Sequence, residues 1–217
     1  MEGEHRLPAT GRIARFAAGH QAVAVAVALP DSLVPLLVLA YLTDSDVAHY
    51  YAAFTIAFSL RLLATNLASA LTVEGARGED DLRALTRRVS RFGAAVLLPA
   101  SLFVVIAAEP ILHLFGGDYA RSASELLRWF GAALPFAAIV VIGLALERVH
   151  QRIVAALVIA GVSTATTIAV DVALLGDLGI RGAGIGFLAG QVAGALLVLL
   201  AHVLRRGRLR VVSADQT

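Results

Sequence analysis

The feature that most constrains this chain is a series of apolar stretches long enough to cross a lipid bilayer. An α-helix rises 1.5 Å per residue, so about 20 residues cross a hydrocarbon core of about 30 Å. Of the 217 residues, 59% are hydrophobic and 16% are charged, whereas about a quarter of the residues in a soluble domain are charged. We therefore predict an all-α integral membrane protein.

Charged and glycine-containing breaks divide the apolar sequence into six predicted transmembrane helices. The predicted spans are 17–42, 48–73, 92–109, 126–146, 153–175 and 182–204, with a polar N-terminal segment 1–16, a charged loop 74–91 and a polar tail 205–217. Pro30 and Pro35 predict that the first helix is broken. The loop is expected to hold a short amphipathic helix from Asp80 to Arg88. A cleaved signal peptide is disfavoured because the first apolar run is too long.

The arginines predict the orientation of these helices. All 18 basic residues are arginine, and 14 of them fall on the side of the N-terminus: Arg6, Arg12, Arg15, Arg77, Arg83, Arg87, Arg88, Arg91, Arg148, Arg152, Arg205, Arg206, Arg208 and Arg210. The other side holds Arg121, Arg128 and Arg181. Because short cytoplasmic segments are enriched in arginine and lysine, we expect a multi-pass protein of a bacterial plasma membrane with both termini in the cytoplasm.

The second predicted helix carries the remaining arginine, Arg61, near its middle. A charge at the bilayer centre costs at least about 2.5 kcal/mol and normally faces protein or a water-filled cavity. A helical wheel places Arg61 in a polar arc with Thr55, Ser59 and Asn66, while the opposite, apolar side suits lipid. These four residues are the candidate substrate-binding residues.

Asp31 in the first helix is the expected partner of Arg61. Asp31 lies about 11 residues before the outer end of its helix and Arg61 about 14 after the start of the next, so their depths differ by roughly one helical turn. Two interpretations remain open, because the pair either fixes helix packing alone or holds Arg61 until an anionic substrate displaces the carboxylate.

Three further features are candidates for coupling or packing. His20 shares a face of the first helix with Asp31 and is expected near the interface, where a proton relay is the less favoured role. Asp171 in the fifth helix is expected to serve packing rather than ion coupling. The sixth helix carries a glycine at every fourth position, which predicts close approach of another helix. These glycines are Gly182, Gly186, Gly190 and Gly194.

Several function classes are disfavoured by the sequence. There is no cysteine, which excludes disulfides and thiolate metal sites. No motif typical of a catalytic nucleophile, a zinc protease or a phosphate-binding loop is present, so we expect neither an enzyme nor a cofactor nor a metal site. The net charge of +2 and the sorting of arginines by membrane side do not indicate a nucleic-acid surface.

Three runs of the sequence resemble a transporter family. They are LPDSLVPLLVLAYLTDSDVAHYYAAFTIAFSLRLLATNLASALTVEGAR, EPILHLFGGDYARSASELLRWFG and LGDLGIRGAGIGFLAG, which include the elements LFGGDYA and LGIRGAGIG. They resemble the C-terminal half of polysaccharide flippases of the O-antigen and teichoic-acid type, particularly actinobacterial ones. These proteins belong to the multidrug/oligosaccharidyl-lipid/polysaccharide exporter superfamily.

The resemblance implies one six-helix bundle facing another across a cleft that passes a polyprenyl-diphosphate-linked saccharide. Arg61 would then receive the diphosphate. The family's N-terminal bundle has no counterpart in this sequence, so the chain is expected to be a fragment, to pair with a separate N-terminal-half protein or to form a homodimer. The alternatives are one half of a drug/cation antiporter that uses Asp31 or Asp171 for coupling, and a non-transporting membrane subunit or truncated remnant.

Overall fold

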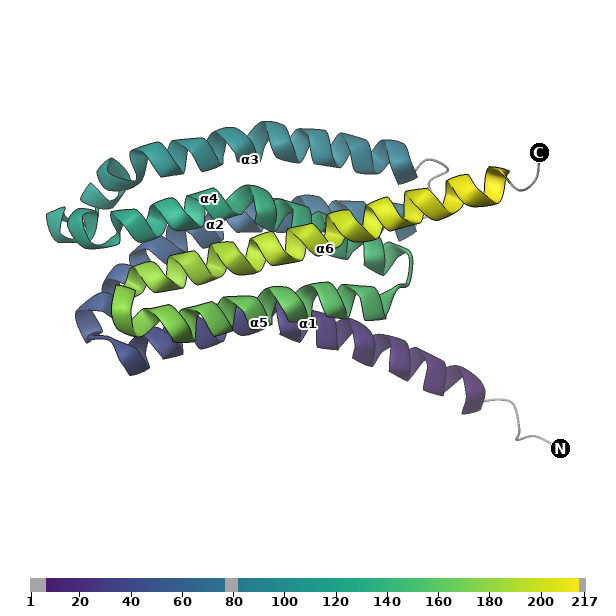
Figure 1. Cartoon of the computed structure of the whole chain (residues 1–217), viewed down its shortest axis with the longest axis horizontal. Coiled ribbons are helices and arrows are strands. Elements are labelled where there is room, and N and C mark those ends of the chain that lie inside the picture. Colours follow the sequence, from purple (N-terminus) through teal and green to yellow (C-terminus); the bar gives the residue numbers. More distant parts are fainter. Residues whose placement is uncertain (1–6, 77–81, 215–217) are drawn as a thin grey trace.

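The structure is a computed structural model that describes residues 7–76 and 82–214, although the side chains at both ends and around 67–83 are only partly described. Its described part consists of six α-helices (Figure 1). They are α1 Leu7–Tyr41, α2 Asp44–Ala76, α3 Leu82–His113, α4 Gly117–Val149, α5 Ile153–Leu178 and α6 Ile180–Ala214. Each contains a segment of mean hydropathy 1.3 to 2.2 that is long enough to cross a membrane, which confirms the predicted fold class.

Helix α4 lies at the centre of the bundle and packs against α2, α3 and α6. Helix α5 packs against α6 on one side and α1 on the other. The connections α1–α2, α3–α4 and α5–α6 gather at one end, called here the connector end, while α1 begins and α6 ends at the opposite, terminal end (Figure 1). The consecutive helices α1 and α2 lie less closely together than α2 and α4 do.

The predicted break in the first helix is wrong, because α1 is continuous through Pro30 and Pro35. Proline lacks a backbone N–H and leaves the carbonyl four residues earlier without its intrahelical partner. For Pro30 that carbonyl belongs to Ala26, and the Thr164 hydroxyl of α5 donates to it at 2.6 Å. A neighbouring helix thus supplies the lost hydrogen bond and lets α1 continue.

The predicted charged loop 74–91 is also mostly helical. Helix α2 extends to Ala76, and α3 begins at Leu82 and runs unbroken to His113, past Pro99 and Pro110. Residues 77–81 lie outside the described part. The predicted tail is helical to Ala214. The predicted spans cover only the apolar parts of the helices. The helices extend into the flanking polar sequence because arginine, leucine and alanine are good helix formers.

The turns at the connector end are short. Thr43 caps α2, because its Oγ1 accepts from the Asp46 N–H at 3.3 Å while Asp46 Oδ2 accepts from the Thr43 N–H at 3.1 Å. This reciprocal arrangement resembles a capping box. Gly116 and Gly179 lie in the turns before α4 and after α5, with φ values of 128° and 59° that glycine adopts readily.

Candidate functional site

An ion pair between Arg61 and Asp31 joins α2 to α1 inside the bundle. The Arg61 Nη2 donates to Asp31 Oδ2, and the two side chains are 15% and 23% exposed. The structure therefore brings together the two charges that residue counting placed at similar depths. One carboxylate therefore holds the guanidinium. Because both side chains are partly exposed, the pair is also accessible from outside the bundle.

Aromatic rings surround one side of Arg61. Its guanidinium carbon lies 5.1 Å from the centre of the Phe58 ring, within range of a cation–π interaction. Phe54 stacks between Phe58 and Tyr50 on α2, with ring centroids 5.5 and 5.6 Å apart. The i, i+4 spacing of these three aromatic residues was the sequence signal that could have predicted this lining.

Two pockets meet at Arg61. The first lies between α1, α2, α4 and α6 and is lined by Asp31 and by the aromatic rings of α2, Phe130 and Phe187. The second lies between α1, α4, α5 and α6 and adds the polar groups of Ser163, Thr164 and Gln191. Each is small, with room for about one or two water molecules, and is partly open to the exterior. Arg61 is positioned to contact a group entering either pocket.

The other three predicted substrate-binding residues do not join Arg61. Thr55, Ser59 and Asn66 are exposed on the side of α2 that points away from the bundle. Thr55 and Ser59 each donate to the carbonyl four residues earlier in their own helix, both at 2.8 Å. Arg61 leaves this arc because its long side chain bends inward at the edge of the helix to reach Asp31.

The expectation that the apolar side of α2 faces lipid is likewise wrong. Ala64 on that side is buried and Ile56 and Leu60 pack against the core, while Leu63 at its edge is 45% exposed. A helical wheel separates a polar from an apolar face but does not say which face meets protein. In this bundle the apolar face meets α4 and the polar face points outward.

Asp171 is fully buried between α5 and α6, with an exposed fraction of 0%. Neither carboxylate oxygen has a hydrogen-bond partner in the described part of the chain. A Cβ atom added to Gly186 would overlap Asp171 Oδ1, so the carboxyl contacts the backbone of α6. Gly182, Gly190 and Gly194 also face α5, at Leu174, Thr167 and Ser163 respectively. The glycine ridge therefore receives the polar side of α5.

His20 lies on the inward, partly buried side of α1, as does Asp31. Eleven residues of helix, about 16 Å, separate the two. Neither His20 nor Asp171 lines the two pockets at Arg61. The structure thus places the predicted coupling candidates at three separate positions rather than in one site.

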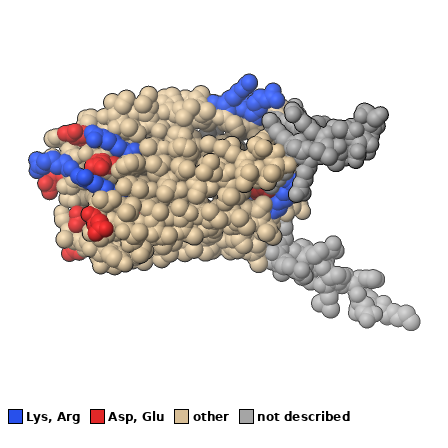
Figure 2. Space-filling model, viewed as in Figure 1, with Lys and Arg blue, Asp and Glu red and all other residues tan. Residues whose placement is uncertain are grey.

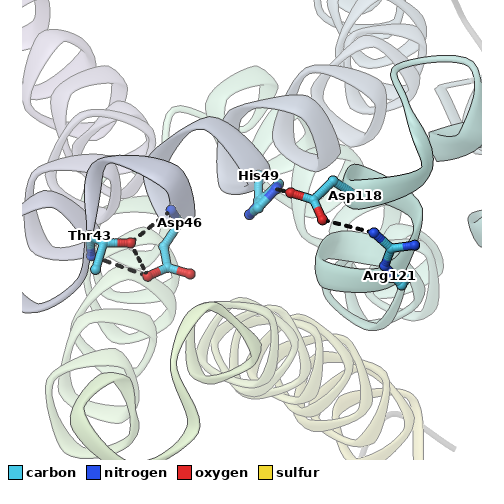
Figure 3. Close-up of polar contacts among 5 residues, drawn as sticks. All are labelled: Thr43, Asp46, His49, Asp118 and Arg121. Carbon is cyan, nitrogen blue, oxygen red and sulfur yellow. Dashed lines mark hydrogen bonds and ion pairs between the residues drawn. The ribbon is translucent and has the colours of Figure 1, made fainter.

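A polar cluster at the connector end had not been predicted from the sequence. His49 of α2 is buried, and its Nε2 lies 3.8 Å from Asp118 Oδ2 at the start of α4 (Figure 3). Arg121 donates to the other oxygen of Asp118 at 3.1 Å, and the Tyr119 ring meets His49 edge to face at 4.9 Å. The cluster ties the start of α2 to the start of α4.

Charged side chains gather at the two ends of the bundle, and the visible face between them is uncharged (Figure 2). The three arginines at the connector end are all paired with carboxylates. Arg121 pairs with Asp118, Arg128 lies 3.9 Å from Glu109, and Arg181 lies 3.0 Å from Glu125. This banding is typical of a bundle whose middle lies in hydrocarbon.

A comparison with family models supplies the family. The model described as MatE matches residues 31–173, about two thirds of the chain. The chain belongs to the MatE family. The family is part of the multidrug/oligosaccharidyl-lipid/polysaccharide exporter superfamily, whose members are membrane transporters. The matched range includes Asp31, Arg61 and Asp171. Comparisons with curated proteins and with solved structures returned no match.

Proposed function

We propose that this MatE-family protein takes part in moving a polyprenyl-diphosphate-linked saccharide across the bacterial plasma membrane, with both termini in the cytoplasm. The observation that carries the proposal is the position of Arg61. Its guanidinium lies at the junction of two pockets within the apolar part of the bundle and is held by a single, partly exposed carboxylate. A buried cation that borders open space suits an anionic group that enters from outside.

The ion pair gives Arg61 two states. Without substrate, Asp31 neutralises the guanidinium, because an unpaired charge at this depth is costly. A diphosphate offers more oxygens in a geometry that the planar guanidinium binds through two parallel hydrogen bonds. The substrate would then replace Asp31, and the pair would form again after release.

The other wall of the translocation path is proposed to come from a second bundle that faces α2. The outward side of α2 carries small or polar residues at spacings of three and four. These are Ala48, Thr55, Ser59, Thr65, Asn66 and Ser69, and the larger exposed side chains of Tyr51, Leu62 and Leu63 lie beside them. The outward positions of α3 and α6 also carry large apolar side chains, including Phe103, Ile106, Leu196 and Val203. Small residues favour close helix packing in membranes, and an exposed asparagine amide favours a polar partner.

Either a second copy of this chain or a separate bundle of the same family would supply that wall. A second copy related by an axis along the membrane normal keeps both termini on one side. It would also place one Asn66 opposite another at equal depth, where the amide donor and acceptor pair with each other.

A second candidate function is the export of organic cations. The first pocket combines the Asp31 carboxylate with a lining of aromatic rings, which suits a cationic amphiphile. In that function Asp31 rather than Arg61 would contact the cargo, and an Asp31→Asn variant would lose ion-dependent efflux. An Arg61→Ala variant would keep it. If the chain is a non-transporting subunit, neither Asp31→Asn nor Arg61→Ala would change transport.

Export of lipid-linked saccharide in cells that depend on this chain tests the proposal. We expect Arg61→Ala to abolish export and Arg61→Lys to retain part of it, because lysine keeps the charge but loses the planar fork. Leu102→Ala is the control, since Leu102 is exposed on α3 and lines neither pocket. Normal export by Arg61→Ala at normal protein levels would contradict the proposal.

A further inference from the structure

Asp171 is a carboxyl group that the Arg61 site does not use. It lies seven residues before the end of α5, about 10 Å from the connector end of the helix, and is fully buried. Its Oδ1 touches the α6 backbone at Gly186, where a Cβ would also lie 2.9 Å from the Thr167 carbonyl oxygen. The carboxyl is therefore enclosed between two helix backbones.

No cation in the described structure neutralises this group. The hydroxyls on the same side of α5 are engaged with backbone, since Thr167 donates to the Ser163 carbonyl at 3.1 Å and Ser163 donates to the Gly190 carbonyl at 2.9 Å. An ionised carboxylate without a partner is far more costly to bury than a neutral carboxylic acid. A bound proton removes the charge and gives the group an O–H donor, for which the Thr167 carbonyl is a nearby acceptor.

The other titratable groups around this part of α5 do not supply a positive charge that would neutralise Asp171. From α2, the buried Tyr50 lies within electrostatic range of Asp171, and it is neutral or negative but never positive. Asp31 and Arg61 are paired with each other. At the connector ends of α4 and α6, Glu125 and Arg181 are also paired with each other. The charges of these two pairs thus already balance each other.

We propose that Asp171 is a proton-binding site and that its proton permits the close contact of α5 with α6. Release of the proton to water leaves a carboxylate against the Gly186 backbone, and α6 must then move away or admit water. We assign a proton rather than a transition-metal ion, because the described residues contain no group of three or more histidine, cysteine, aspartate or glutamate side chains that could hold one. The proposal holds whichever cargo the Arg61 site takes.

The single tryptophan of the chain reports on this contact. Trp129 lies on α4, and its Cβ is 2.7 Å from the position of a Cβ built on Gly184 of α6, two residues from Gly186. Movement of α6 would therefore change the surroundings of Trp129. Asparagine matches the shape of a neutral aspartic acid and does not ionise in this range, so Asp171→Asn mimics the proton-bound state.

The test follows Trp129 fluorescence and the thermal unfolding midpoint of the full chain in lipid nanodiscs between about pH 5 and about pH 9. We expect the wild-type emission to shift and the midpoint to fall by several degrees as pH rises, while Asp171→Asn keeps the low-pH values throughout. Ser124→Ala on α4 is expected to titrate like the wild type. The same transition in wild type and Asp171→Asn, or no transition in the wild type, would overturn the proposal.

A second measurement decides the matter if Asp171→Asn does not fold. The infrared spectrum of the wild-type protein in heavy water is expected to show the carbonyl band of a protonated carboxylic acid at neutral pH, where exposed carboxyls are ionised. Absence of that band at neutral pH would also overturn the proposal.

Discussion

The Ser101 hydroxyl on α3 donates a 2.7 Å hydrogen bond to the Gly131 carbonyl on α4, four residues before Pro135. Proline leaves that carbonyl without its intrahelical partner, just as Pro30 does for Ala26. At these two prolines, a hydroxyl of a neighbouring helix replaces the lost bond. Both bonds also fix the register between the helices that they join.

Removal of either hydroxyl is expected to destabilise the bundle. We expect Ser101→Ala and Thr164→Val each to lower the unfolding free energy by about 1 to 2 kcal/mol, because a buried carbonyl loses its partner. Thermal unfolding in detergent measures the effect. Ser69→Ala is the control, since its exposed hydroxyl binds only its own helix and its loss is expected to change little. Equal midpoints for Ser69→Ala and Ser101→Ala would contradict this account.

The glycine ridge makes a second prediction about stability. A Cβ at Gly190 would overlap Thr167 Oγ1 and lie 2.6 Å from the Ser163 carbonyl oxygen, which is fixed backbone. We expect Gly190→Ala to force α5 and α6 apart at a cost of about 1 to 3 kcal/mol. Gly161→Ala is the matched control, because a Cβ there meets nothing within 4 Å. If the two variants unfold at the same temperature, the ridge is not a close contact.

The outward face of α2 makes a prediction about assembly. The chain has no cysteine, so single cysteines report contacts without background. If a second copy packs on this face, Ser59→Cys will form a disulfide-linked dimer in native membranes, whereas Phe103→Cys on the outward side of α3 will not. A crosslinked product that contains a different membrane protein would indicate the separate bundle instead. No product from either cysteine would argue against a partner at α2.

Substitution of Asn66 on the same face of α2 is expected to change dimer formation. In a pair of copies, the two amides would hydrogen-bond to each other, at a gain of roughly 0.6 to 2 kcal/mol in a membrane. We expect Asn66→Leu to weaken dimer formation by about threefold or more while Asn66→Gln retains part of it. Native mass spectrometry at several protein-to-lipid ratios measures this. Stronger association of Asn66→Leu would mean that the face packs by apolar contact alone.

Features that depend on composition, segment length and residue position along a helix could be predicted from the sequence. The six apolar spans followed from length and hydropathy, and the pairing of Arg61 with Asp31 followed from their depths. Both properties are local to one or two helices that are consecutive in the chain. The positions of Pro30 and Pro35 were equally visible, but the hydroxyl that replaces the lost bond at Pro30 belongs to Thr164, 138 residues from Ala26 in the sequence.

The remaining differences come from tertiary contacts that a single helix does not reveal. The polar arc of α2 was visible on a helical wheel, but its direction depends on where α4 packs. The polar side of α5 and the glycines of α6 were both noted in the sequence. Only the register between the two helices places Asp171 against Gly186 and leaves it fully buried.

Direct binding of a polyprenyl diphosphate tests the central claim most directly. The measurement is native mass spectrometry of the wild-type protein, Arg61→Ala and Asp31→Asn with undecaprenyl diphosphate, and with undecaprenol as the uncharged control. We expect wild-type protein to prefer the diphosphate, Arg61→Ala to lose that preference, and Asp31→Asn to bind it at least as tightly because the competing carboxylate is gone. Equal binding of the diphosphate by wild type and Arg61→Ala would contradict the account.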